Sequence, residues 1–141
     1  MAAAFESPQQ LREVMDRVFT MMSEDPGMGP QLRAADVPQR FEFDDFDMVV
    51  NVRAARAGEP GNLRWEWSDD VDWEPRVLMS MSSETANRYF QGRENVMVAI
   101  ARRRIRTGGD VKAALGLMPI VKPIHERYRA MVAAEYPQLL V

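Results

Sequence analysis

The spacing of apolar residues changes its period twice along the chain, and this constrains the fold more than any other feature. Apolar residues recur every three or four positions before about residue 25, every second position from about residue 40, and every three or four positions again after about residue 82. The outer patterns are typical of amphipathic helices, and the middle pattern is typical of half-buried strands. The sequence therefore predicts an α+β fold built on one sheet.

A helix is expected near the N-terminus, over residues 7–24. Ser7 is followed three residues later by Gln10, which suits a helix cap, and Pro8 occupies the first helical position. Asp25-Pro26-Gly27 ends the pattern. The apolar residues between these ends form a single stripe: Leu11, Val14, Met15, Val18, Phe19 and Met22.

Four strands are expected next, at residues 40–44, 48–52, 63–67 and 76–81. Because short turns join them, we expect them to pair in chain order as an antiparallel meander. A fifth short strand is expected at residues 104–106, closed by Gly108-Gly109. With the helices expected before and after them, these strands are typical of an α+β fold on one sheet.

Helical signals return around and after the strands. Beyond a short helical piece at residues 31–35, they run from Ser82 to near Gly92, from about Glu94 to Ala101, from Val111 to Leu117 behind the cap Asp110, and from Pro119 to Ala134 with Pro123 in the first turn. The sheet and its helices thus occupy about residues 40–134, within a single domain of residues 1–141.

Composition excludes several classes of function. With 18 Lys+Arg and 21 Asp+Glu the formal charge is −3, so nucleic acid is not an expected partner. The absence of Cys excludes disulfides, Cys/His catalysis and Cys-ligated metal sites. No signal peptide, membrane-spanning stretch or peroxisomal C-terminus is recognisable, so we expect a cytoplasmic protein.

No catalytic residue, metal site or cofactor is predicted. The acidic runs at residues 44–47 and 69–72 lack the Gly of a calcium loop, and Asp is common in turns. His125 is the only histidine and no nucleophile signature accompanies it. We interpret it as an exposed or helix-supporting residue.

The densest charge run extends from Arg102 to Arg106, interrupted only by Ile105. Arginines on an edge strand prevent pairing with other chains, and charge runs usually face solvent. The functional alternative is that Arg102, Arg104 and Arg106 bind a lipid headgroup or dock transiently on an anionic membrane surface.

Residues 77–122 carry a recognisable order of features. Val77-Leu78-Met79-Ser80-Met81-Ser82-Ser83-Glu84 leads to Phe90-Gln91-Gly92-Arg93, and Arg104-Ile105-Arg106-Thr107-Gly108-Gly109-Asp110 leads into the helix at 111–117. This resembles the sterol carrier protein 2 (SCP2-like) lipid-transfer family, more loosely so back to about residue 40. The resemblance implies a five-stranded, mostly antiparallel sheet covered by helices, with an apolar tunnel between sheet and helices. It also implies non-catalytic binding and transfer of a sterol, fatty acid, acyl-CoA or related lipid.

Bulky apolar residues on the predicted sheet and its covering helices are the candidate ligand-binding residues: Trp65, Trp67, Met79, Met81, Phe90, Leu115, Met118, Ile120 and Met131. The 11 methionines suit either an ordinary core or an adaptable cavity. An empty tunnel of at least roughly 300 Å³ would cost on the order of 7 kcal/mol, so it should hold lipid, water or collapsed Met side chains. We expect a monomer or a weak dimer.

Two other functions stay open. An enzyme or accessory subunit acting on an isoprenoid or a polyketide would need a polar group buried in the same pocket, and a strongly shifted pKa would favour it. The available groups are Tyr89, Tyr128, His125 and Asp110. A non-binding interaction module would instead dock a partner on the stripe from Leu11 to Met22, and burial of that helix on its own domain would argue against it.

Overall fold

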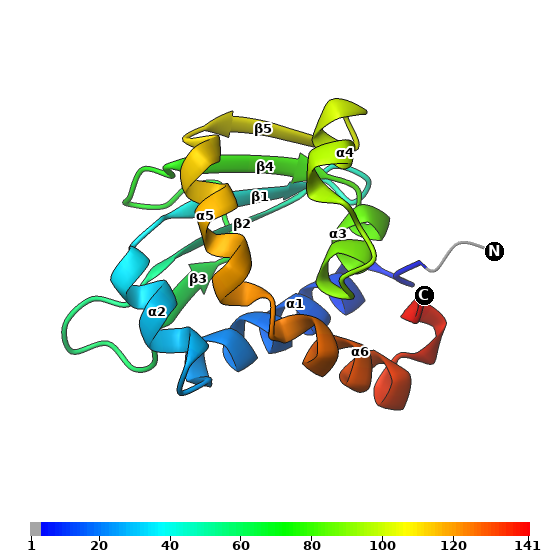
Figure 1. Ribbon diagram of the computed structural model, residues 1–141, viewed down its shortest axis with the longest axis horizontal. Coiled ribbons are helices and arrows are strands. Elements are labelled where there is room, and N and C mark those ends of the chain that lie inside the picture. Colours follow the sequence, from blue (N-terminus) through cyan, green and yellow to red (C-terminus); the bar gives the residue numbers. More distant parts are fainter. Residues whose placement is uncertain (1–3) are drawn as a thin grey trace.

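The structure of the protein is a computed structural model that describes residues 4–141 (Figure 1). The strands are β1 (Gln39–Phe43), β2 (Met48–Ala54), β3 (Leu63–Glu66), β4 (Val77–Met81) and β5 (Ile105–Gly109). The helices are α1 (Pro8–Glu24), α2 (Met28–Ala35), α3 (Ser83–Phe90), α4 (Val96–Ala101), α5 (Val111–Val121) and α6 (Ile124–Glu135), followed by the short 3-10 helix η1 (Pro137–Leu139). The α+β class and the five-stranded sheet are confirmed.

The strands lie in the order β3-β2-β1-β4-β5, and the sheet is mixed. β1 pairs antiparallel with β2, β2 with β3, and β4 with β5, whereas β1 and β4 are parallel, with Phe41 beside Met79. The expected meander is therefore wrong at its fourth strand. Period-two spacing shows which face of a strand is buried, but it does not show which neighbour the strand pairs with.

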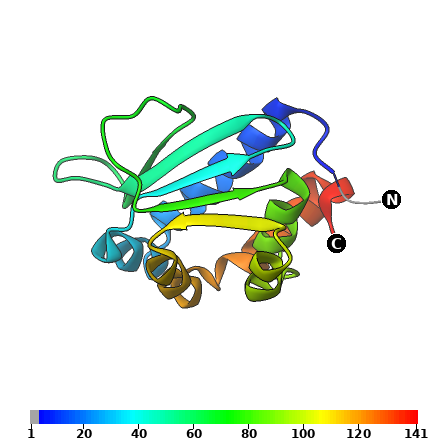
Figure 2. The same ribbon diagram turned by 90° about the horizontal axis from the view of Figure 1, so that it is seen from above.

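Residues 68–76 of the loop that connects β3 to β4 pack on the polar face of the sheet. The side-chain amide of Asn51 on β2 donates a hydrogen bond to the Ser68 carbonyl at 2.8 Å. The Arg53 guanidinium lies 5.0 Å from the ring centre of Trp73. Figure 2 shows this loop on one side of the sheet and α4 and α5 on the other.

α1 begins and ends where the sequence predicts. The Ser7 side chain accepts a hydrogen bond from the Gln10 N–H at 3.1 Å, and Pro8 is the first helical residue. The whole apolar stripe is buried, and its most exposed member, Met22, is only 6% exposed. Because the protein's own core covers this stripe, the structure argues against a module that docks a partner there.

The boundary between the last two helices differs from the expected one. α5 continues through Pro119 to Val121, and α6 begins after Pro123. A proline near the end of a helix removes few intrahelical hydrogen bonds, so Pro119 is tolerated. Pro123, with φ of −62°, occupies the N-cap of α6 instead.

β5 is longer than expected, because Thr107, Gly108 and Gly109 belong to the strand. Gly109 has a φ of +73°, and a Cβ there would lie 2.3 Å from the Arg76 carbonyl oxygen. The Gly-Gly pair therefore does not end the strand early. It permits the close approach of β4.

The helices and the apolar face of the sheet share one hydrophobic core, which includes Phe43, Val50 and Ile105 from the strands. α6 packs against α1 and α3 rather than directly on the sheet. Within residues 4–141, no helix combines the length and the apolar character needed to cross a membrane.

Candidate functional site

A pocket lies between the sheet and the helices, and every strand contributes to its wall. The contributing positions alternate along a strand, because only one face points toward the helices. Phe41, Met79 and Thr107 form a row across three adjacent strands. The lining residues on the sheet are Gln39, Phe41, Phe43, Val52, Ala54, Leu63, Met79, Met81 and Thr107.

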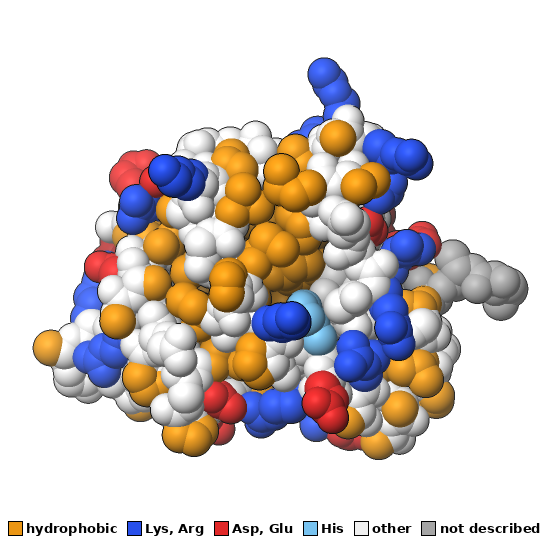
Figure 3. All heavy atoms as spheres, viewed as in Figure 1, with side chains coloured by type: hydrophobic (Ala, Val, Ile, Leu, Met, Phe, Trp, Pro, Cys, Tyr) orange, Lys and Arg blue, Asp and Glu red, His pale blue; other side chains and the backbone are white. Residues whose placement is uncertain are grey.

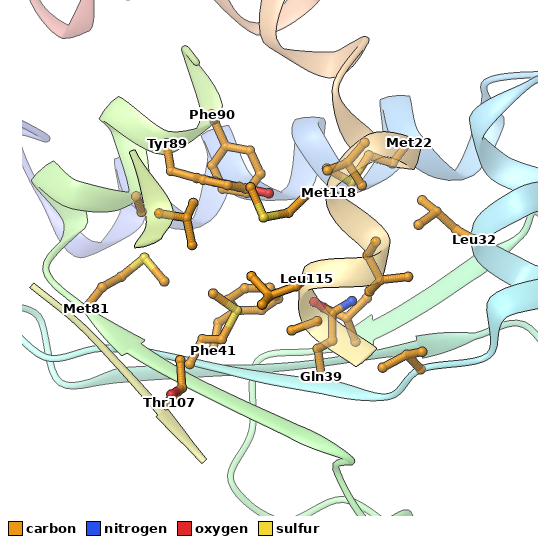
Figure 4. Close-up of a pocket in the computed structure, with 18 of the residues that line it drawn as sticks. Met22, Leu32, Gln39, Phe41, Met81, Tyr89, Phe90, Thr107, Leu115 and Met118 are labelled. Atoms are coloured by element: carbon orange, nitrogen blue, oxygen red, sulfur yellow. The ribbon is translucent and has the colours of Figure 1, made fainter. Parts of the chain in front are cut away.

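The opposite wall is mainly helical, and α5 contributes more residues to it than any other helix. Val111, Ala114, Leu115 and Met118 are three or four residues apart and therefore share one helix face. In Figure 4, Leu115 and Met118 point from α5 into the space between Phe41 and Phe90. The lining residues outside the sheet are Phe19, Met22, Leu32, Val37, Ala86, Tyr89, Phe90, Val96, Ile100, Val111, Ala114, Leu115, Leu117, Met118 and Val121.

The pocket has a volume of about 70 Å³. At about 24 cal/mol per Å³, a void of this size costs about 2 kcal/mol, which a folded domain tolerates. The space is thus smaller than the roughly 300 Å³ expected of a lipid tunnel. Flexible side chains fill part of it, and an entering lipid would have to displace them. The methionines of the wall are Met22, Met79, Met81 and Met118.

The polar groups of the pocket are uncharged. They are the amide of Gln39 and the hydroxyls of Tyr89 and Thr107. Burial raises the pKa of Tyr89 to about 12, because a tyrosinate there would lose its water shell. Tyr89 therefore stays protonated near neutral pH and can donate a hydrogen bond to a ligand oxygen. The direction of this pKa shift does not suit proton transfer near pH 7.

Several of the candidate residues predicted from the sequence lie together in this wall: Met79, Met81, Phe90, Leu115 and Met118. The two methionines share the inward face of β4, as their spacing indicates. The structure therefore brings together residues of β4, α3 and α5, which are separate segments of the chain.

Trp65 and Trp67 do not line the pocket. They lie on the side of the sheet that faces the helices, Trp65 on β3 and Trp67 directly after it, but α1 covers them. The rings of Trp65 and Phe19 are 5.5 Å apart. Both indole Nε1 atoms donate hydrogen bonds to Oδ1 of Asp16, at 3.0 Å from Trp65 and 2.7 Å from Trp67. The two tryptophans therefore attach α1 to the sheet.

Ile120 and Met131 also lie outside the pocket wall. Ile120 is on α5 but off the face that carries Leu115 and Met118. Met131 is buried on α6, a helix that packs against α1 and α3. Sequence spacing identifies both as apolar helix positions, but it does not show which layer each helix faces.

Of the polar groups considered for an enzyme, Tyr89 reaches the pocket wall and the other three do not. Tyr128 is fully buried in the core. The Nδ1 atom of His125 lies 2.9 Å from the Phe90 carbonyl oxygen, so this side chain supports the junction of α3 and α6. Asp110 caps α5.

The three arginines proposed to bind a headgroup have different environments. β5 is an edge strand, and Arg106 on it lies 2.6 Å from Asp44. Arg104 lies 2.7 Å from Glu94. Arg102 is exposed at the C-cap of α4, and no ion pair is found for it among residues 4–141. They do not form one free basic patch.

The acidic runs lie in turns and loops. The carboxylate of Asp45 accepts hydrogen bonds from the N–H and the hydroxyl of Ser83, at 2.8 and 2.6 Å. It thereby holds the start of α3. In the described part of the chain, no group of His, Cys, Asp and Glu side chains is arranged to hold a metal ion.

Some of the missed pocket residues carry a sequence signal and some do not. Gln39 and Phe41 alternate on β1 as Met79 does on β4, so strand parity predicts their inward direction. Met22 and Leu32 carry no comparable signal. Their place in the wall depends on how α1 and α2 pack against the sheet, which is a non-local property.

No protein-family model and no curated protein sequence matches the chain, but solved structures do. The sec-alkylsulfatase Pisa1 from Pseudomonas sp. superposes with a TM-score of 0.55 at 13% identity, over 65% of this chain and 14% of the enzyme. The chain thus spans about one seventh of that enzyme's length.

Two other structures match over nearly their whole length. The UbiJ-SCP2 ubiquinone synthesis protein superposes with a TM-score of 0.60 at 9% identity, over 86% of this chain and 95% of its own. Sterol carrier protein 2 from Yarrowia lipolytica, in its apo form, superposes with a TM-score of 0.54 at 10% identity, over 89% of this chain and 98% of its own. The chain therefore has the SCP2-like fold that its order of sequence features predicts.

Proposed function

We propose that the protein binds an uncharged lipid in the pocket between sheet and helices and carries it without changing it chemically. One observation carries the proposal: the 24 residues that line the pocket include no Asp, Glu, Lys, Arg or His. An unpaired buried charge is costly, so an apolar molecule with a neutral polar end fits this wall best. The fold supports the proposal, since one similar structure is named as a sterol carrier.

The polar groups of the wall narrow the ligand class. Tyr89 and Thr107 can donate hydrogen bonds, and the amide of Gln39 can both donate and accept. They suit a ligand hydroxyl or carbonyl group, as in a lipid alcohol or ketone. A fatty acid or acyl-CoA would bring an anionic group to a wall that holds no cation.

An enzyme or accessory subunit acting on an isoprenoid or polyketide is the second candidate. Tyr89 is the observation that favours it, since this residue combines a pocket position with a shifted pKa. Because the pKa rises, the hydroxyl suits hydrogen-bond donation in binding better than acid–base chemistry.

Native mass spectrometry of the purified protein, followed by solvent extraction, tests the proposal. A discrete apolar adduct is expected, and its release identifies the ligand class. A clean apo mass together with no uptake of a fluorescent lipid alcohol would contradict it. A fluorescent fatty acid should bind more weakly than the alcohol at pH 7 and should gain affinity as lower pH neutralises its carboxyl group. Preference for the anionic form would refute the neutral ligand class.

Two variants of α5 localise the site. Leu115→Trp fills the pocket from its wall and should abolish uptake of the lipid alcohol. Ile120→Trp adds the same side chain to the same helix outside the wall and should leave uptake unchanged. Equal loss in both variants would show that α5 is perturbed generally and would leave the pocket without support as the binding site.

A further inference from the structure

The helices α4 and α5 lie on either side of the pocket. Both are apolar on the face turned away from the pocket as well as on the face that lines it. α4 has no charged residue, and α5 has one, Lys112. Val96 and Ile100 of α4 line the pocket, whereas Met97 and Val98 are 59% and 39% exposed. Helix faces in contact with water normally carry polar residues, and contiguous exposed apolar ones mark a contact surface.

Cations surround these apolar side chains. Figure 3 shows hydrophobic side chains in a hollow between α5 and α4, continuing onto the outer end of α4, with Lys and Arg side chains around them. One exposed cation, Lys112, lies on α5, and four others lie shortly before or after the two helices in the chain: Arg93, Arg102, Arg103 and Lys122. Among residues 4–141, no ion pair is found for any of these five.

Three acidic residues lie near these cations in sequence, and two of them are paired with other arginines. Asp110 lies 2.9 Å from Arg76. Glu126, four residues after Lys122, is exposed and has no ion pair among residues 4–141, so it offsets one cation of the five. The Glu94 carboxylate has nearly no exposed surface and lies 2.7 Å from Arg104 and 3.4 Å from Arg88. The overall charge of −3 therefore conceals a local excess of positive charge around α4 and α5. We call the exposed faces of these two helices, with the five cations, the α4–α5 surface.

We propose that the α4–α5 surface docks on an anionic lipid bilayer, an inference that rests on the proposed function. Charge complementarity decides the occupant: apolar side chains rimmed by unpaired cations match a bilayer, whose anionic headgroups lie over an apolar interior. The hollow between the same helices leads to the pocket wall, so docking here would let a lipid pass between bilayer and pocket without crossing water. An acidic protein is the alternative occupant.

Co-sedimentation with vesicles tests the docking. The protein should bind vesicles of equal parts phosphatidylcholine and phosphatidylglycerol more tightly than pure phosphatidylcholine vesicles, and salt should weaken the binding. The double variant Arg102→Gln, Arg103→Gln should lower the partition coefficient about thirtyfold. The control Arg33→Gln, Arg64→Gln removes two exposed arginines outside this surface. It changes the net charge by the same amount and should leave the partition coefficient unchanged.

The apolar contribution needs its own pair of variants. Met97→Ser, Val98→Ser should lower vesicle binding about fivefold, whereas Leu140→Ser, Val141→Ser, at similarly exposed positions, should not. Equal effects within either pair, or no vesicle binding by the wild type, would overturn the proposal and leave the surface to an acidic protein.

Uptake of a fluorescent lipid alcohol delivered from cyclodextrin separates this inference from the proposed function. The two variants that weaken docking, Arg102→Gln, Arg103→Gln and Met97→Ser, Val98→Ser, should take up the lipid alcohol normally. Leu115→Trp should bind vesicles normally and fail to take it up. Loss of both properties in the docking variants would show that they disturb the pocket, and this would contradict a separate docking surface.

Discussion

The indole Nε1 of Trp67 donates a hydrogen bond to Oδ1 of Asp16 at 2.7 Å, across 51 positions of the chain. Trp65 donates to the same oxygen at 3.0 Å. One carboxylate on α1 thus holds one indole on β3 and another directly after it, and this joins the N-terminal helix to the edge strand of the sheet. The arrangement also closes the pocket at that edge, since Phe19 of α1 lies both against Trp65 and in the wall.

Asp16→Ala should lower the free energy of unfolding by about 1 to 2 kcal/mol, because two indole donors lose a partly exposed charged acceptor. Asp16→Asn keeps an acceptor oxygen and should cost less. Urea unfolding measures both, with Glu13→Ala on the exposed face of α1 as control. Equal stability of the Asp16→Ala and Glu13→Ala variants would contradict the bridging role.

Ser23→Ala tests the junction between the end of α1 and the start of β3. The Ser23 hydroxyl oxygen accepts hydrogen bonds from the N–H groups of Asn62 and Leu63, at 2.9 and 3.0 Å. Alanine leaves both donors without a partner in a buried place, so we expect a loss of about 1 to 3 kcal/mol in urea unfolding. Thr20→Ala, an exposed change one turn earlier, should have a small effect. A neutral Ser23→Ala would show that water replaces the hydroxyl.

Tyr89 provides a pH test of the pocket. Its pKa in the folded protein is raised from 10 to about 12. A raised pKa means that the folded state holds the proton more tightly, so this contribution to stability is complete below pH 10 and is lost as the pH rises toward 12. Tyrosinate absorbance is titrated against pH in the wild type and in Tyr89→Phe. The difference between the two curves reports Tyr89 alone and should rise above pH 11. Titration near pH 10 would place the hydroxyl in water. In urea, both proteins should titrate normally.

α1 is the element that the sequence predicts best, and the reason is that its signals are local. The cap Ser7, the first-turn Pro8 and the apolar stripe are all within one helix length. The pairing of β4 is different. Its neighbour, β1, lies more than thirty positions earlier in the chain, and nothing in the alternation of Met79 and Met81 distinguishes β1 from β3 as a partner.

Residues that line the pocket can be predicted from the sequence where alternation along a strand decides the direction of the side chain. They cannot be predicted where the packing of helices decides that direction. Met79 is in the wall because it lies on the inward face of a central strand. Trp65 has the same inward direction on β3, but α1 occupies the space in front of it. The sequence also predicts Ile120 and Met131 in the wall, and neither is there. The reason is related, because apolar spacing on a helix does not identify the layer that the helix faces.

The small volume of the pocket implies that stability and ligand uptake oppose each other. Ala114 lines the pocket on α5, and its neighbour Ala113 does not. Methionine is a good helix former and fills irregular spaces, so Ala114→Met should fill part of the 70 Å³ void and raise the free energy of unfolding by about 0.5 to 1.5 kcal/mol.

The same change should weaken uptake of a lipid alcohol at least tenfold, because the added side chain occupies the space that the ligand needs. Ala113→Met supplies the matched control on the same turn of α5 and should change neither quantity appreciably. Urea unfolding and fluorescence titration of the two variants measure both effects. If Ala114→Met gains stability and still takes up lipid normally, the ligand binds elsewhere and the void is only a packing defect. If it loses both stability and uptake, the wall is rigid and the methionines do not yield to a ligand.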